Sequence, residues 1–102
     1  MGVIICCLND TKKNIVLIFD EISAGFRIAA GGAHLKLGVN PDIAVFGKAI
    51  SNGYPMSVLI GRGEVMSAAQ DSFISSTYWT ERVGLAAAIA TIKKFIASGI
   101  TK

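Results

Sequence analysis

Two side chains that can do covalent and electrostatic chemistry follow the ends of two apolar runs. Asp20 closes the run at residues 15–19, and Lys48 follows the run at residues 43–46, 28 positions after Asp20. Ligands of parallel α/β sheets gather beyond the carboxyl ends of the strands. If the two runs form neighbouring strands, a carboxylate and an amine face one pocket.

An acid and an amine in one pocket are what a pyridoxal phosphate site needs. The carboxylate of Asp20 would keep the pyridine nitrogen protonated, so that the ring can accept electrons. The amine of Lys48 would bind the cofactor covalently as a Schiff base. The two residues are compatible with pyridoxal phosphate chemistry. Taken alone, Asp20 is more often a helix cap or a loop salt-bridge partner in such a position, and Lys48 an exposed lysine beyond a strand.

The elements that must position these side chains are indicated by hydrophobic pattern. Residues 15–19 are a continuous β-branched and aromatic run, which is typical of a central parallel strand covered on both faces. A glycine-rich loop is expected at 23–38, and the turn Asn40-Pro41-Asp42 leads to a second strand at 43–46. Further elements are expected as a strand at 56–61, a short helix at 64–69 and a long helix at 81–97.

Three stretches resemble the class III aminotransferase family, and its glutamate-1-semialdehyde aminomutase branch most of all. They are LIFDEISAGFR, GGAHLKLGVNPDIAVFGKAISNGYPMSVLIGRGEVM and SSTYWTERVGLAAAIATI, and the likeness covers residues 8–95. It implies an α/β fold, part of the large domain of fold-type-I pyridoxal-phosphate-dependent transferases, with mostly parallel strands and flanking helices. It also implies a homodimer that transfers amino groups of small amino acids or amino-aldehydes. A cytoplasmic location is expected because the opening residues lack the features of a signal peptide.

The resemblance assigns roles to four residues. Asp20 matches the aspartate at the pyridine nitrogen, and Ile22 the aliphatic residue stacked on the ring. Lys48 matches the Schiff-base lysine, and Thr77 the threonine that reaches the cofactor phosphate of the partner subunit. The chain departs from the family pattern at Thr80-Glu81-Arg82 and at Asn52-Gly53. The first departure leaves Thr80 able to cap the following helix.

Composition indicates a piece of a larger structure. The chain has 102 residues, of which 52% are hydrophobic, and so short a chain buries too little surface to hide them. We therefore expect residues 1–102 to be a fragment of the cofactor-binding large domain. The net charge of +3 is scattered, which disfavours nucleic acid, and the opening residues lack the features of a signal peptide. Neighbouring Cys6 and Cys7 are expected to be reduced thiols.

Two other interpretations remain open for the chain as a whole. Asp20-Glu21 after an apolar strand also resembles the Walker B element of an ATPase, but the GxxxxGK[ST] loop is absent. In the second interpretation, the chain is a structural remnant that keeps the sheet and cannot catalyse. The family's phosphate-binding loop lies outside these residues, which favours this interpretation.

Several side chains near the expected site favour structural roles. His34 has no evident second metal ligand and is expected to make a loop hydrogen bond, so no metal site is predicted. Gly31-Gly32 is interpreted as a turn rather than an anion cradle, and Glu21 with Arg27 as a candidate pair. Trp79 is a candidate either for approaching the substrate of the neighbouring subunit or for packing at a dimer contact.

Overall fold

The computed structural model describes residues 15–78 and 81–100. The opening segment with Cys6 and Cys7, and also Trp79 and Thr80, lie outside the described residues. The elements in chain order are β1 (Ile18–Asp20), α1 (Ala33–Leu37), β2 (Ile43–Phe46), the 3-10 turn η2 (Lys48–Ile50), β3 (Val58–Gly61), α2 (Gly63–Met66), the 3-10 turn η3 (Ser67–Asp71) and α3 (Val83–Ser98).

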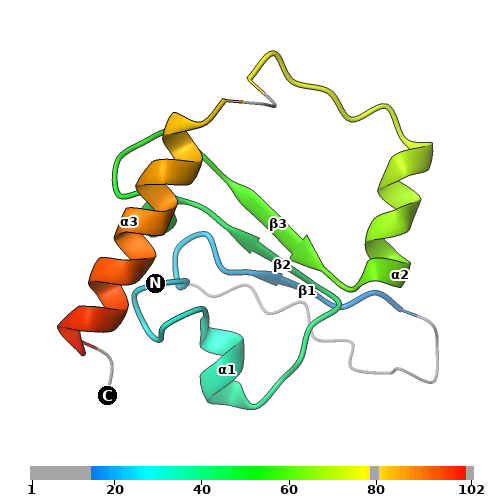
Figure 1. The fold of residues 1–102 in the computed structure, drawn as a ribbon. Helices are drawn as coiled ribbons and strands as arrows, with labels where there is room; N and C mark the ends of the chain where they lie inside the picture. Colours follow the sequence, from blue (N-terminus) through cyan, green and yellow to red (C-terminus); the bar gives the residue numbers. More distant parts are fainter. Residues whose placement is uncertain (1–14, 79–80, 101–102) are drawn as a thin grey trace.

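The three strands form one sheet in the order β1-β2-β3, which confirms the α/β class. β1 and β2 are parallel, with Asp20 opposite Val45, whereas β3 returns antiparallel to β2. The sheet is therefore mixed in the part of the chain that the structure describes. In Figure 1, α3 lies at the end of the sheet where β1 and β2 finish, and α2 lies at the opposite end. Asp20 and Lys48 thus occur at the α3 end.

Helix α3 packs against one face of the sheet at the carboxyl end of β2. Ala44 and Phe46 of β2 point to this face because side chains alternate along a strand, and they form a core with Ile50 and Ala88. Phe26 packs its ring 5.8 Å from that of Phe46 and 6.0 Å from that of Phe95. This aromatic group joins the loop after β1 to the sheet and to α3.

The other face is open, which corrects the prediction of a first strand covered on both sides. Leu17 and Phe19 are buried, but Ile18 is 48% exposed, and Leu59 on the same face is 56% exposed. The regular strand also begins later than predicted, at Ile18. The apolar run indicates a strand suited to burial, and none of the residues at 15–78 and 81–100 covers this face.

Helix α1 was not predicted, because residues 23–38 were expected to be a loop. It begins after Gly32 and ends at Gly38, whose φ of 66° is the left-handed conformation that favours glycine. Its first amides are bound by a carboxylate 12 residues earlier in the chain, at Glu21. A cap that distant leaves no local sequence signal.

The long helix predicted at 81–97 is confirmed as α3, which spans Val83–Ser98. The carboxylate of Glu81 accepts hydrogen bonds from the amides of Val83 and Gly84, at 2.5 and 3.0 Å. The cap observed in the described residues is therefore Glu81, while the predicted cap Thr80 lies outside them. Gly99 ends the helix with φ 61°, as its place in the sequence indicates.

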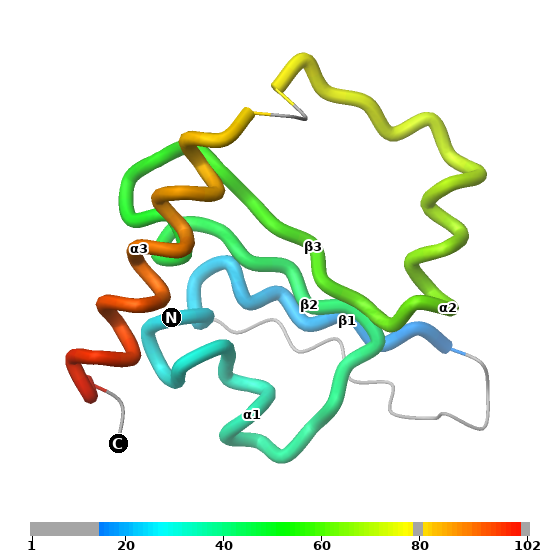
Figure 2. The backbone as a smooth tube through the Cα atoms, viewed as in Figure 1, coloured from blue at the N-terminus to red at the C-terminus, as the bar shows by residue number. Residues whose placement is uncertain are grey.

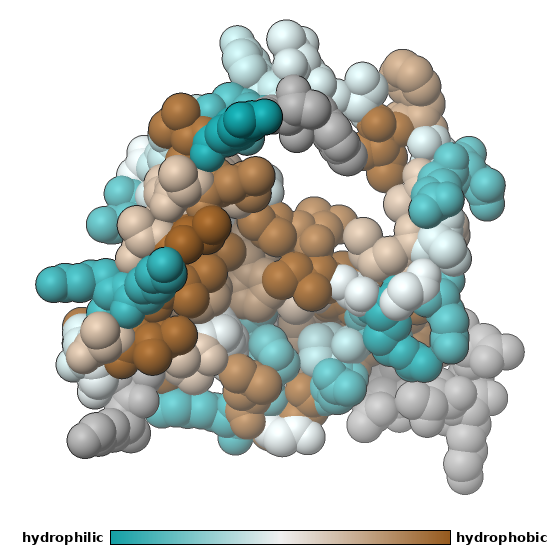
Figure 3. Space-filling model, in the orientation of Figure 1, coloured by the Kyte–Doolittle hydropathy of each residue, from teal (hydrophilic) through white to brown (hydrophobic). Residues whose placement is uncertain are grey.

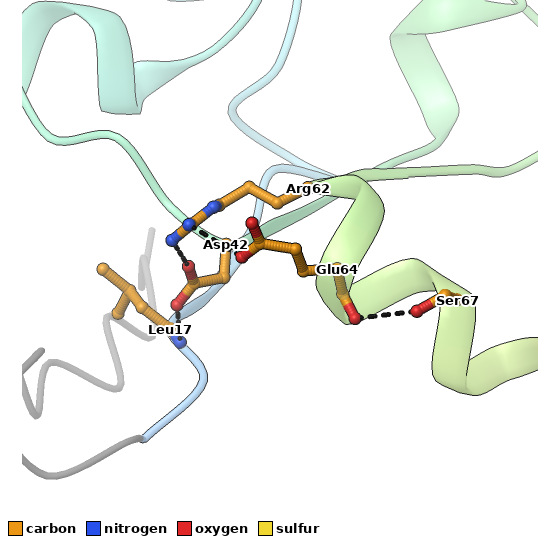
Figure 4. A network of polar contacts seen from close by, with 5 residues as sticks. All are labelled: Leu17, Asp42, Arg62, Glu64 and Ser67. Atoms are coloured by element: carbon orange, nitrogen blue, oxygen red, sulfur yellow. Dashed lines mark hydrogen bonds and ion pairs between the residues drawn. The ribbon is translucent and has the colours of Figure 1, made fainter.

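A polar network at the α2 end ties β1, β2 and β3 together (Figure 4). The carboxylate of Asp42 accepts a hydrogen bond from the Leu17 amide at 2.9 Å and one from the Arg62 guanidinium at 2.9 Å. Arg62 also contacts Glu64 at 3.2 Å, and the hydroxyl of Ser67 donates to the carbonyl of Glu64. Asp42 therefore fixes the start of β2 against the segment leading into β1.

Much apolar surface remains exposed between the helices. Figure 3 shows apolar side chains gathered in the middle of the molecule, between α3 and the segment that carries α2. In Figure 2, residues 72–78 arch from the α2 side toward α3. Among the described residues, no helix has both the length and the apolar character needed to cross a bilayer.

Candidate functional site at the carboxyl ends of β1 and β2

Asp20 is the last residue of β1, and its side chain lies on the open face of the sheet. One carboxylate oxygen accepts a hydrogen bond from the backbone amide of Ile22 at 2.9 Å. Asp20 is exposed, whereas its neighbours Phe19 and Glu21 are buried on the other face. The turn after β1 thus orients the carboxylate through one of its oxygens and leaves the Asp20 side chain accessible to solvent.

Lys48 begins the turn η2 immediately after β2. Its amine donates a hydrogen bond to the hydroxyl of Ser23 at 2.6 Å. Its φ of 45° is left-handed, a conformation that costs a non-glycine residue roughly 1–2 kcal/mol. Such strain persists where surrounding structure imposes it, and it is concentrated at functional sites.

The structure brings three of the four predicted site residues to one edge of the sheet. Asp20 ends β1, Ile22 and Ser23 lie in the turn that follows, and Ser23 contacts the amine of Lys48. A Cβ atom at Gly47 would lie 3.4 Å from the Ile22 side chain, so Ile22 rests against the residue before the lysine. Ser23 was not predicted as a site residue, and only the pairing of the strands reveals it.

Thr77 is not brought to this edge. It lies in the irregular segment before α3 and is exposed. The structure gives no contact between Thr77 and the other three residues. The role implied by the family places this threonine at the partner subunit's cofactor, so its assignment stays a prediction.

Glu21 has a structural position rather than a catalytic one. Its side chain is 1% exposed, and its carboxylate accepts hydrogen bonds from the amides of Ala33 and His34 and from the His34 ring. Burial alone would raise the pKa of the Glu21 carboxyl, but these hydrogen bonds outweigh burial and hold the pKa below its usual range. The candidate pair with Arg27 is wrong, and the predicted loop hydrogen bond of His34 is confirmed.

The buried position of Glu21 also argues against a Walker B element. In that arrangement the glutamate must reach a water molecule beside a bound nucleotide. Both oxygens of Glu21 are already engaged by protein donors, and the side chain faces away from solvent. Glu21 therefore could not activate a water molecule as the glutamate of an ATPase does, which argues against the ATPase interpretation.

A cavity of about 750 Å³ lies between α3 and the turn after β2. It is lined by Lys48 and by two further cations, Arg27 and Lys94, together with aromatic and small side chains. Neither Asp20 nor Ile22 lines it, and the side chain of Asp20 lies on the opposite face of the sheet. Lys48 thus stands at the boundary between this cavity and the edge that carries Asp20.

The residues at the edge fit pyridoxal phosphate by the chemistry of their donors. Asp20 offers an accessible carboxylate to a protonated ring nitrogen, Ile22 an aliphatic surface to a ring, and Lys48 an amine. Among residues 15–78 and 81–100, no group of three or more histidine, cysteine or acidic side chains is arranged to hold a metal ion.

Comparisons with known proteins agree with the geometry. The family model Aminotransferase class-III matches residues 6–102. A 3-aminobutyryl-CoA aminotransferase of Cloacimonas acidaminovorans is 48% identical over 83 residues, which are 80% of this chain and 20% of that protein. A glutamate-1-semialdehyde 2,1-aminomutase of Nitrosopumilus maritimus is 42% identical over 94 residues, covering 84% of this chain and 22% of that protein.

A solved structure shows the same fold. The FumI protein of Sphingopyxis sp. MTA144, in its pyridoxal phosphate internal aldimine form, superposes with a TM-score of 0.78 at 36% identity. The match covers 83% of this chain and 20% of that one. The chain therefore spans about a fifth of the length of the relatives that it matches.

Proposed function

We propose, from the premise that this chain belongs to the class III aminotransferase family, that it supplies the cofactor-binding centre of a pyridoxal-phosphate-dependent aminotransferase or aminomutase. The observation that carries the proposal is the edge where the parallel strands β1 and β2 end side by side. There the carboxylate of Asp20 accepts a hydrogen bond from the Ile22 amide, and the amine of Lys48 donates one to the hydroxyl of the next residue, Ser23. Residues 1–102 would be one part of the large domain, without the family's other segments.

Asp20 and Ile22 would hold the cofactor ring. The carboxylate of Asp20 would accept a hydrogen bond from the protonated ring nitrogen, and a charge-assisted bond of this kind is among the stronger ones in proteins. The amide of Ile22 already fixes one oxygen of that carboxylate, which limits its rotation. Ile22 would cover one face of the ring. When bound, the cofactor supplies an electron sink for a developing carbanion.

Lys48 would have two tasks. Its amine would bind the cofactor covalently, and after displacement by the substrate amine it would move the proton at the substrate α-carbon as a general base. The hydroxyl of Ser23 holds the amine at the edge before that exchange. The substrate is proposed to be a small amino acid or amino-aldehyde.

The assembly is proposed to be a cytoplasmic homodimer in which Thr77 of one subunit reaches the cofactor phosphate in the other. The exposed position of Thr77, away from Asp20 and Lys48, supports a role toward a second subunit. The exposed apolar side chains on the open face of the sheet support the proposal that this chain packs within a larger structure.

A cofactor titration tests the proposal. The complete protein that carries these residues is mixed with pyridoxal phosphate, and its visible absorption is recorded for the parent and for Lys48→Ala. Lys94→Ala is the matched control, because Lys94 lines the same cavity as Lys48. The parent and the control should acquire the absorption of a covalently held cofactor, and Lys48→Ala should not. Equal spectra for all three proteins would refute the role of Lys48.

The same titration separates the enzyme from a structural remnant. If the 102-residue chain alone and the complete protein both fail to bind the cofactor, these residues have kept only the sheet. Binding by the complete protein alone would show that the segments outside this chain are needed.

A further inference from the structure

Glu21 lies between the two residues proposed to hold the cofactor ring, Asp20 and Ile22. Its side chain points the opposite way, because successive side chains at the end of a strand alternate between faces. It reaches the start of α1, while Asp20 faces the open side. Any shift of Glu21 must therefore move the backbone that carries Asp20 and Ile22.

Five hydrogen bonds fix Glu21 in place. Its amide donates to the carbonyl of Val45 on β2 at 2.8 Å, and its carbonyl accepts from the amide of Gly25 at 2.7 Å. The carboxylate accepts three more, from the amides of Ala33 and His34 at 2.9 Å each and from the His34 ring at 2.8 Å. The backbone and side chain of Glu21 thus join strand β2, the turn after β1 and the start of α1 at one residue.

The carboxylate packs closely against Gly32. A Cβ atom at Gly32 would lie 2.5 Å from a carboxylate oxygen of Glu21 and 2.6 Å from the His34 ring nitrogen. Gly32 itself has extended backbone, so it is required by this close approach rather than by its φ. The ring of Phe19 also stands edge-on to the His34 ring, with centroids 6.1 Å apart.

We propose that Glu21 is a positioning residue, whose buried carboxylate locks the turn after β1 to the start of α1 and so fixes Asp20 and Ile22 for the cofactor. The inference rests on the proposed function. Glu21 touches neither Lys48 nor the open face, so its effect on the cofactor must pass through the backbone on either side of it.

The first test replaces the carboxylate with an amide of the same shape. Glu21→Gln puts an NH2 group against backbone donors, leaving one of them without an acceptor. Groups that orient the ligands of metal sites contribute roughly 10–100-fold to metal affinity. By analogy, we expect the dissociation constant of pyridoxal phosphate to rise by about tenfold. Glu64→Gln is the matched control, since Glu64 is 86% exposed and should leave binding unchanged.

The second test moves the carboxylate without changing any charge. Gly32→Ala inserts a methyl group against Glu21 and His34, whereas a Cβ atom at Gly63 would meet nothing within 4 Å. Gly32→Ala should weaken cofactor binding as Glu21→Gln does, and Gly63→Ala should not. All measurements are made on the complete protein at a temperature where circular dichroism shows each variant to be folded.

Coupling to Asp20 distinguishes positioning from general stability. If Glu21 acts through Asp20, Glu21→Gln should weaken binding much less in an Asp20→Asn background, because the group it positions has already lost its charge. A purely structural role would lower the melting temperature and leave affinity unchanged in the folded variants.

Two outcomes overturn the inference. One is normal cofactor affinity in folded Glu21→Gln and Gly32→Ala, and the other is full additivity with Asp20→Asn. Both differ from failure of the proposed function, in which the parent protein itself would not bind the cofactor at Lys48.

Discussion

The amine of Lys48 donates its hydrogen bond to the hydroxyl of Ser23, three positions after Asp20. This contact joins the turn after β2 to the turn after β1, and it sets the direction of the lysine side chain. Ser23→Ala would leave the amine without this acceptor. We expect pyridoxal phosphate affinity to fall by about two- to tenfold, as for loss of one hydrogen bond to a charged group at an exposed site.

Ser23→Thr is the control for that change, because it keeps the hydroxyl. It should bind the cofactor nearly as well as the parent in the same absorption titration. A Ser23→Ala protein with unchanged affinity would mean that the hydroxyl does not orient the amine.

Acid should remove the contribution of Glu21 to stability. Its folded pKa is held below the usual value near 4.3 for a glutamate, so its stabilising contribution is complete above that value. The contribution is lost as the pH falls through the folded pKa. The only titratable side chain that contacts the carboxylate among the described residues is His34.

Urea midpoints of the parent and Glu21→Gln between pH 3 and 6 measure this effect. The difference between the two proteins should be largest above about pH 5 and should shrink toward pH 3. A difference that grows on acidification would contradict the assigned direction of the pKa shift.

Asp42 should matter more to stability than its partner Arg62. Asp42 accepts hydrogen bonds from both the Leu17 amide and Arg62, which together hold the pKa of Asp42 below its usual range. The Arg62 side chain is 55% exposed, and exposed ion pairs contribute little. Asp42→Ala should therefore lower the melting temperature more than Arg62→Ala, as measured by circular dichroism, and equal effects would argue against the Leu17 bond.

Gly25 should not tolerate a side chain. A Cβ atom there would lie 2.6 Å from the Phe46 ring and 2.8 Å from the carbonyl oxygen of Glu21. Overpacking of this kind costs about 1–3 kcal/mol. Gly25→Ala should lower the free energy of unfolding by that amount in urea titrations, and Gly63→Ala should leave it nearly unchanged.

The sequence predicted the elements whose signals are local. The apolar runs before Asp20 and Lys48 indicate strands, and the alanine-rich stretch ending at Gly99 indicates α3. Resemblance to a family, rather than spacing, assigned Ile22 and Thr77. The prediction that Asp20 and Lys48 lie at neighbouring strand ends depends on the parallel pairing of β1 with β2, which the structure shows.

What could not be predicted depends on contacts between distant residues. Helix α1 is held at its start by Glu21, and Ser23 meets Lys48 only after the strands pair. Glu21 was considered with Arg27 because both lie in one loop, whereas its partner His34 follows a glycine pair that indicated only a turn. Ile18 and Leu59 are exposed on the second sheet face because none of the residues that the structure describes packs on it, and no pattern within the strands indicates this.

The central claim is that Lys48 binds pyridoxal phosphate covalently at the edge shared with Asp20. The complete protein is incubated with the cofactor, reduced with borohydride, digested and examined by mass spectrometry. We predict that the phosphopyridoxyl group is found on the peptide containing Lys48, and that Asp20→Asn reduces its yield at limiting cofactor. An adduct on other lysines only, or none at all, would contradict the claim.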